Sequence, residues 1–152
     1  PKHVQQLVEE NHLRWDSMGE FCALGESLKF LGETKGNAQA TILGKAVDIA
    51  TQGILDHNKS PGRKTGQPDN RDSHFYFALY WAQALAAQTD DADLAAHFAP
   101  IAEKLSANEA KITAELAAVQ GAPADLGGYY HGDAAKTAAV MRPSATFSQI
   151  IG

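Results

Sequence analysis

Residues 75–88 form an almost uninterrupted apolar run, in which only Gln83 and Gln88 are polar. A helix made from this run would be apolar on nearly every face, and such helices lie in protein interiors. The preceding residues, 56–74, contain two prolines and two glycines, which exclude a regular helix there. The sequence therefore predicts a buried central helix that follows directly on an irregular loop.

The loop over residues 56–74 is basic, although the 152-residue chain has a net charge of −5. Its cationic residues are Lys59, Arg63, Lys64 and Arg71. We expect this concentration of positive charge to attract an anion. The loop is not a nucleotide-triphosphate P-loop, because Arg63 and Asn58 stand where that motif requires glycine.

Two interpretations of the basic loop are open at this point. One is a site for a phosphomonoester, because an arginine fork can hold such a group with two hydrogen bonds and Pro61 restricts the loop beforehand. The other is a solvated loop whose cations pair with Asp69 and Asp72, and surface pairs of that kind contribute little energy.

Apolar residues elsewhere recur at spacings of three and four, which is typical of amphipathic helices. Counting their expected caps, the predicted helices cover residues 1–10, 17–31, 37–54, 69–88, 90–105, 106–119, 133–141 and 144–150. Ser17 with Glu20 and Ser106 with Glu109 have the form of capping boxes. No stretch alternates as a strand would, so we predict an all-α fold. Residues 1–152 are expected to form a single helical segment, with an irregular stretch rich in glycine and tyrosine after Gly121.

The composition sets limits on the class of protein. Hydrophobic residues make up 44% and charged residues 20%, and no apolar segment approaches the roughly 18–20 residues that span a bilayer. We therefore expect a soluble, cytoplasmic protein without a membrane partner. The acidic balance argues against nucleic acid as a partner. The lone Cys22 cannot form an intramolecular disulfide, and its helical spacing from Met18 predicts a buried thiol.

A second candidate site combines His3 with the stretch from His12 to Asp16. Arg14 could stack on Trp15 or on a purine ring, while Asp16 could orient the guanidinium or accept a hydrogen bond from a sugar hydroxyl. The alternative places Trp15 in the core and pairs Arg14 with Asp16 or Glu20.

Metal and nucleophile motifs are missing from the sequence. The six histidines show no HExxH or comparable spacing, and a single cysteine excludes zinc-finger arrangements. We therefore predict no metal held by this segment alone. No nucleophile elbow or kinase signature occurs, so no catalytic residue is predicted in it.

Several uncommon stretches occur in an order that resembles one known family. They are PKHVQQ from residue 1, LRWDS from 13, NKSP from 58, DNR from 69, SHFY from 73, ALYWAQALAAQT from 78, GGYYH from 127 and MRPSATF from 141. Together they resemble the C-terminal part of the monomeric-type NADP-dependent isocitrate dehydrogenases. The chain begins abruptly at Pro1, which we interpret as the start of a fragment of such an enzyme.

The resemblance implies a function for the parent enzyme. The family oxidises isocitrate to 2-oxoglutarate and carbon dioxide and reduces NADP with the help of Mg²⁺ or Mn²⁺. Its catalytic lysine and tyrosine, most isocitrate ligands and the metal-binding aspartates lie upstream of this segment. The implied partner is therefore the remainder of the parent chain, in which these helices form part of a larger α/β domain. The segment alone is expected to be inactive.

The resemblance also assigns the candidate site residues. His3, Arg14 and Arg63 correspond to residues around the adenosine 2′-phosphate of NADP, and Asp16 to a further cofactor contact. Asp72 departs from the glycine expected in the family's pattern, and residues 67–68 depart from a more acidic pair. The competing hypothesis is a stand-alone helical module whose basic loop holds a phosphorylated ligand or an acidic partner.

Overall fold

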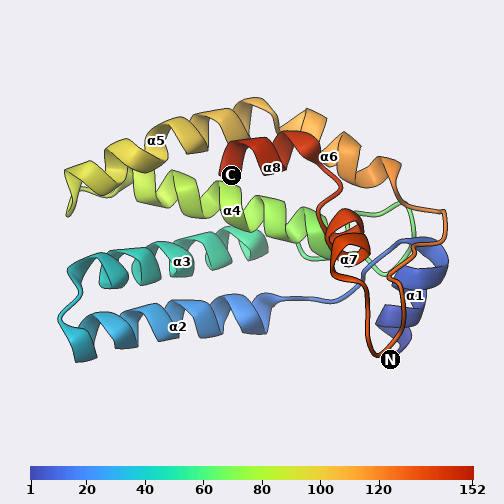
Figure 1. The fold of residues 1–152 in the computed structure, drawn as a ribbon. Coiled ribbons are helices and arrows are strands. Elements are labelled where there is room, and N and C mark those ends of the chain that lie inside the picture. The colour runs from blue at the N-terminus through green and yellow to red at the C-terminus, as the bar shows by residue number, and fades with distance from the viewer. The chain divides into compact units, whose positions relative to one another are not determined.

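The computed structural model describes residues 1–152 and contains eight α-helices and no strand (Figure 1). The helices are α1 (Lys2–Glu10), α2 (Met18–Lys35), α3 (Ala38–Asp56), α4 (Asn70–Ala87), α5 (Ala92–Ala107), α6 (Glu109–Ala118), α7 (Ala134–Met141) and α8 (Ala145–Ile151). The predicted all-α fold is confirmed. No helix is both long enough and apolar enough to cross a membrane.

The chain divides into two compact units, and the helix α4 contributes to both. Unit 1 comprises Pro1–Asp16, Ser60–Ser73 and Asn108–Gly152, and unit 2 comprises Ser17–Lys59 and His74–Ala107. Residues 60–73 of the basic loop and all four candidate cofactor residues belong to unit 1. That residues 1–152 act as one segment of a longer chain stays a prediction.

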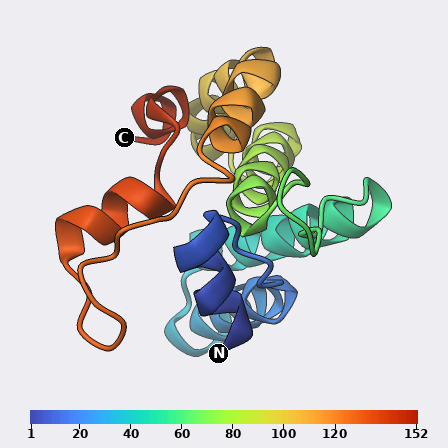
Figure 2. The same cartoon turned by 90° about the vertical axis from the view of Figure 1, so that its right-hand side faces the viewer.

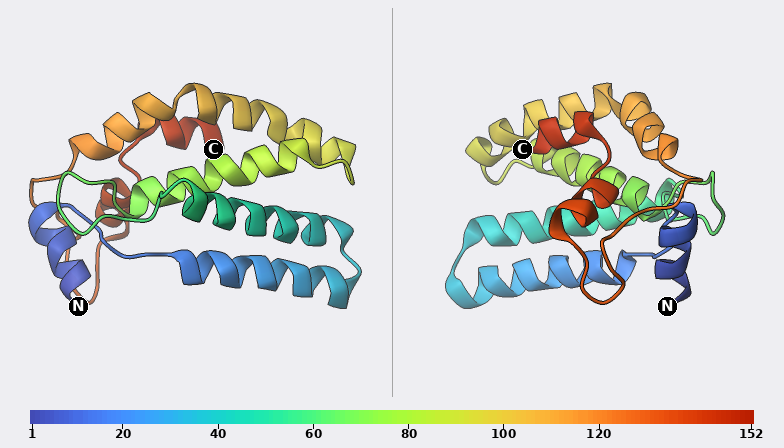
Figure 3. Two further views of the ribbon diagram at one scale, coloured as in Figure 1. Left: turned by 180° about the vertical axis from the view of Figure 1, so that it is seen from behind. Right: turned by 45° about the vertical axis from the view of Figure 1, so that its right-hand side comes forward.

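In unit 2, α2 and α3 run antiparallel side by side, as Figures 1 and 3 both show. Small residues allow this close approach, because a Cβ on Gly44 would lie 2.9 Å from the carbonyl oxygen of Gly25. The predicted burial of the central helix is confirmed: Phe75 is fully buried, and Phe77 stacks on Phe21 with ring centroids 4.1 Å apart.

In unit 1, the segment after α6 is bound to the C-terminal end of α1. The N–H of Gly121 donates to the carbonyl of Glu10 at 2.7 Å, and the N–H of Ala124 donates to the carbonyl of Val8 at 2.9 Å. The following residues up to α7 form the predicted irregular stretch, visible in Figure 2 as a loop without helix. These bonds hold residues near position 120 close to the start of the chain.

Three local predictions are wrong. Cys22 is exposed, because helical spacing identifies a face of α2 but not whether another element covers that face. Ser106 does not open a capping box, since α5 continues to Ala107, and Asn108 precedes α6 without a side-chain cap. Ser17 does stand before α2, but its side chain makes no capping hydrogen bond.

Candidate cofactor-binding site

One face of α1 contacts both segments that carry the candidate residues. The ring of His3 lies 4.9 Å from the ring of Trp15, and the side chain of Gln6 donates to the carbonyl of Arg63 at 3.1 Å. One turn further on, Glu10 accepts a hydrogen bond from the hydroxyl of Thr65. Residues spaced by three or four along a helix share a face. The segment before α2 and the basic loop are therefore both placed along this face of α1.

The carboxyl of Glu10 is electrostatically coupled to this region. The hydrogen bond from Thr65 and then that from Gln6 lower the pKa of Glu10, and the positive charges of His12 and Arg14 act in the same direction. A carboxylate that accepts such hydrogen bonds stays ionised. Glu10 thus provides a fixed negative charge beside the basic loop.

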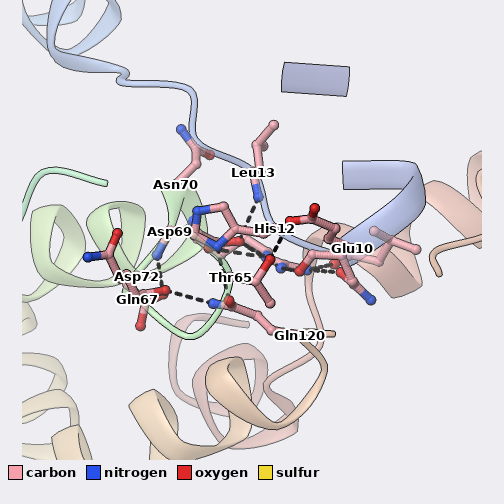
Figure 4. A network of polar contacts seen from close by, with 12 residues as sticks. Glu10, His12, Leu13, Thr65, Gln67, Asp69, Asn70, Asp72 and Gln120 are labelled. Carbon is pink, nitrogen blue, oxygen red and sulfur yellow. Dashed lines mark hydrogen bonds and ion pairs between the residues drawn. The ribbon is translucent and has the colours of Figure 1, made fainter. Parts of the chain in front are cut away.

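The basic loop is closed by hydrogen bonds to its own backbone and to Gln120 (Figure 4). Gly62 donates to the carbonyl of Pro68 at 2.8 Å, which closes the loop across its base. The side chain of Gln120 accepts from the N–H of Gly66 at 2.8 Å and donates to the carbonyl of Gln67 at 2.9 Å. These bonds hold the loop in one conformation and leave the side chain of Arg63 exposed.

Arg71 lies at the centre of a buried network. Its guanidinium forms an ion pair with Asp69 at 2.7 Å, and it also donates to Asn11 and to the carbonyl of Val140, each at 2.8 Å. Arg71 and Asp69 are only 4% and 1% exposed. Arg71 is therefore not available to an external anion. Of the two cation–carboxylate pairs expected for a solvated loop, only the pair of Arg71 with Asp69 forms, and it is buried.

The remaining cations of the basic loop differ in their surroundings. Lys59 belongs to unit 2, where its ammonium lies 4.3 Å from the ring centre of Tyr76. Arg63 and Lys64 are exposed and take part in none of the ion pairs of the structure. The positive charge that this loop offers to a ligand is thus concentrated on two adjacent residues.

Arg14 is half-buried and likewise takes part in no ion pair, so the expected pair with a nearby carboxylate does not form. Trp15 is 44% exposed, and the alternative that placed it in the core is wrong. Asp16 is exposed and His3 half-buried. The assignment of His3, Arg14, Asp16 and Arg63 to a cofactor stays a prediction.

Asp72 takes part in the start of α4, where the family pattern led us to expect glycine. Its carboxylate accepts the N–H of Asp69 at 2.8 Å, and the carboxylate of Asp69 in turn accepts the N–H of Arg71 at 2.9 Å. Asp69 thus caps the start of α4 through the N–H of Arg71, and Asp72 returns a hydrogen bond to the backbone of Asp69 in a variant of the capping box. Burial raises the pKa of Asp72, and the nearby charge of Asp69 adds to that rise.

Replacing Asp72 with asparagine is expected to stabilise the protein at neutral pH. The amide oxygen can still accept the N–H of Asp69, while the cost of burying a second carboxylate disappears. Because the folded-state pKa of Asp72 is raised, the wild type loses stability as pH increases through that pKa, and Asp72→Asn does not. The advantage of the variant in unfolding free energy should therefore be larger at pH 7 than at pH 4, as measured by chemical denaturation.

Asp72→Ala serves as the matched control, because it removes the acceptor as well as the charge. It should cost on the order of 1 kcal/mol, the usual effect of losing a helix cap. An Asp72→Asn advantage that is the same at both pH values would show that the carboxylate is not penalised in the folded state.

Sequence reasoning gave no role to His12 itself or to Gln120, and it expected a loop cation to pair with Asp69 only at the surface. His12 is fully buried, with one ring nitrogen facing Gln120 and the other facing the carbonyl of Gly62. Gln120 lies 108 residues after His12, and no local pattern connects the two. The spacing of the two aspartates around Arg71 indicates a helix cap from the sequence alone. The hydrogen-bond network across unit 1 could not be predicted in this way.

Comparison with known proteins identifies the family. The model of the monomeric isocitrate dehydrogenase family matches residues 1–152. A relative named isocitrate dehydrogenase (NADP) 2 from Mycobacterium tuberculosis is 60% identical over 97% of this chain and 20% of the relative. Isocitrate dehydrogenase (NADP) from Azotobacter vinelandii is 59% identical over the same shares, and isocitrate dehydrogenase (NADP) 2 from Colwellia maris is 57% identical over 99% of this chain and 20% of the relative.

The chain therefore belongs to the monomeric isocitrate dehydrogenase family, and the family expected from the sequence is confirmed. It spans about a fifth of the length of the curated relatives that it matches.

Proposed function

We propose that this chain supplies the part of an NADP site that holds the adenosine 2′-phosphate, in an isocitrate dehydrogenase that oxidatively decarboxylates isocitrate to 2-oxoglutarate. The observation that carries the proposal is the meeting of two segments on α1. His3 contacts Trp15, the neighbour of Arg14 and Asp16, and Gln6 binds the backbone of Arg63. The names of the relatives, which specify NADP, support the choice of cofactor.

The chemistry of the exposed side chains fits a phosphate. A phosphomonoester carries between one and two negative charges near neutral pH, and an arginine can bind it with two charge-assisted hydrogen bonds. Neither Arg14 nor Arg63 takes part in an ion pair, so neither would have to break one to bind the phosphate. Protonated His3 would add a third positive group, and Asp16 would contact another part of the cofactor.

The chemical step belongs to other parts of the longer enzyme in this proposal. Bound NADP would accept the hydride from isocitrate, while this chain would bind and orient the adenosine end of the cofactor. No group of three or more histidine, cysteine, aspartate or glutamate side chains is placed here to hold a metal ion. Following the resemblance to the family, we place the Mg²⁺ or Mn²⁺ site and most isocitrate ligands in the remainder of the parent chain, which is this segment's principal partner. The rival stand-alone binding module gains no support from relatives that are all named isocitrate dehydrogenases.

Replacing Arg63 with alanine in the full-length enzyme tests this proposal. Losing a hydrogen bond to a charged group costs about 1.5–3 kcal/mol, so the KM for NADP should rise roughly ten- to a hundredfold. NAD lacks the 2′-phosphate, and its weak use should hardly change. Steady-state kinetics with both cofactors would measure the two effects.

Lys64→Ala is the matched control, because Lys64 is the neighbouring exposed cation and has no assigned role. It should raise the KM for NADP much less than Arg63→Ala does. Equal losses with NADP and NAD in Arg63→Ala would mean that Arg63 does not bind the 2′-phosphate.

A further inference from the structure

Both ring nitrogens of the buried His12 face oxygen atoms (Figure 4). Nδ1 lies 2.9 Å from Oε1 of Gln120, and Nε2 lies 2.9 Å from the carbonyl oxygen of Gly62. The imidazole is fully buried, so water cannot replace either partner. His12 therefore joins the base of the basic loop to the turn that follows α6.

The orientation of the Gln120 amide is set by two further hydrogen bonds. Its oxygen accepts the N–H of Gly66 at 2.8 Å, and its nitrogen donates to the carbonyl of Gln67 at 2.9 Å. A reversed amide would place its NH₂ group against the N–H of Gly66 and its oxygen against the carbonyl of Gln67. The atom facing Nδ1 of His12 is thus an acceptor, as is the carbonyl of Gly62.

Two acceptors at one imidazole require two N–H groups. A neutral imidazole has one N–H and one lone pair, so it can donate to only one of the two oxygens. The other nitrogen would then face an oxygen with its lone pair, which is repulsive and leaves a buried acceptor without a donor. Only the imidazolium form makes both hydrogen bonds.

We propose that His12 is a positioning residue that acts as an imidazolium clamp: its two N–H groups hold residues 60–68 against the turn after α6 and so set the place of Arg63. The clamp thereby makes the grip of Arg63 on the 2′-phosphate depend on both N–H groups of His12. This second statement rests on the function proposed for Arg63, whereas the clamp itself rests on the contacts of His12.

Some charged groups around His12 interact favourably with a positive charge on its ring, and others oppose it. On α1, the carboxylate of Glu10 interacts favourably with the positive charge of His12, and this contributes to the lowered pKa of Glu10. Arg14, two residues further along, also acts on Glu10 and opposes a second positive charge. The neighbours of His12 in the chain contact the buried ion pair, since the N–H of Leu13 donates to Asp69 and Asn11 accepts from Arg71. Gln120, on the remaining side, is neutral.

Hydrogen exchange of the loop tests the clamp without reference to any cofactor. In the full-length enzyme, exchange would be followed by mass spectrometry on peptides covering residues 60–68 between pH 6 and 9, after correction for the intrinsic effect of pH on exchange. Protection of this segment, which includes the N–H groups of Gly62 and Gly66, should fall by about tenfold as His12 is deprotonated, the usual effect of losing a hydrogen bond to a charged group. Protection that stays constant over this range would overturn the proposal.

His12→Gln provides the matched variant. Its side-chain nitrogen can still donate to the carbonyl of Gly62, but glutamine does not titrate and cannot also reach Gln120. Protection of residues 60–68 should be lower than in the wild type at pH 6 and should not change with pH. A pH-dependent fall that persists in His12→Gln would also overturn the clamp. If this variant fails to fold, the wild-type pH series decides alone.

Kinetics then separate the clamp from the proposed function. The KM for NADP should rise about tenfold from pH 7 to 9 in the wild type, with little change in kcat, and should stay nearly constant in His12→Gln. His3→Gln is a necessary background, because His3 is a second histidine in the proposed phosphate site, where it contacts Trp15. Loop protection that falls with pH while KM in the His3→Gln background stays flat would support the clamp and contradict the role of Arg63. Loop protection that does not change with pH, together with a strong effect of Arg63→Ala on the KM for NADP, would contradict the clamp and support the role of Arg63.

Discussion

Replacing Arg71 with methionine should lower the unfolding free energy by about 3–5 kcal/mol, because it leaves the buried carboxylate of Asp69 without its positive partner. The substitution also removes the donors to Asn11 and to the carbonyl of Val140, which connect the loop to two other parts of unit 1. Methionine fills much of the same volume, so the loss would come from the polar network and not from a cavity.

Arg71→Lys tests the positive charge of this side chain separately from the planar geometry of the guanidinium. Lysine can keep a positive charge beside Asp69, but a single ammonium cannot reproduce the directions in which the guanidinium donates. Its stability should lie between those of the wild type and of Arg71→Met in urea denaturation. Lys64→Ala, at an exposed position in the same loop, should change stability by less than about 0.5 kcal/mol. A loss in Arg71→Met as small as that of Lys64→Ala would rule out a structural role for the buried pair.

Replacing Gly44 with valine should separate α2 from α3 and cost about 2–3 kcal/mol. A Cβ at this position would lie 2.9 Å from the carbonyl oxygen of Gly25 and 3.0 Å from the backbone nitrogen of Lys29. These are backbone atoms of the facing helix, so a side-chain rotation cannot relieve the clash. The whole of α2 would have to move, and its contacts with the core of unit 2 would weaken.

Gly19→Ala is the matched control in the same unit, because a Cβ there would meet nothing within 4 Å. Alanine favours helix over glycine by up to about 1 kcal/mol, so this variant should be neutral or slightly more stable. Thermal unfolding followed by circular dichroism would compare the two. If Gly44→Val melts at the temperature of Gly19→Ala, the close approach of α2 and α3 does not matter for stability.

Local sequence patterns were sufficient for the helices and for the character of the loop. Local patterns predicted all eight helices, most of them by spacings of three and four, and the apolar run predicted the burial of α4, because these features depend on residues within one or two turns of each other. The cap of Asn37, which accepts the N–H of Ala40, is local in the same sense. The uncommon stretches along the chain were enough to indicate the family.

The tertiary structure alone decided which of the predicted groups have partners. His12 and Gln120 are 108 residues apart, and Arg71 contacts Asn11 and Val140 across 60 and 69 residues, so periodicity could not reveal these contacts. The same holds for exposure: the pattern around Cys22 describes a helix face, but burial requires another element to cover it. Folding buries Arg71, so it cannot meet a ligand, and leaves Arg63 and Lys64 exposed. A buried charge requires a partner and a surface charge does not, so only the tertiary structure separates these two kinds of cation.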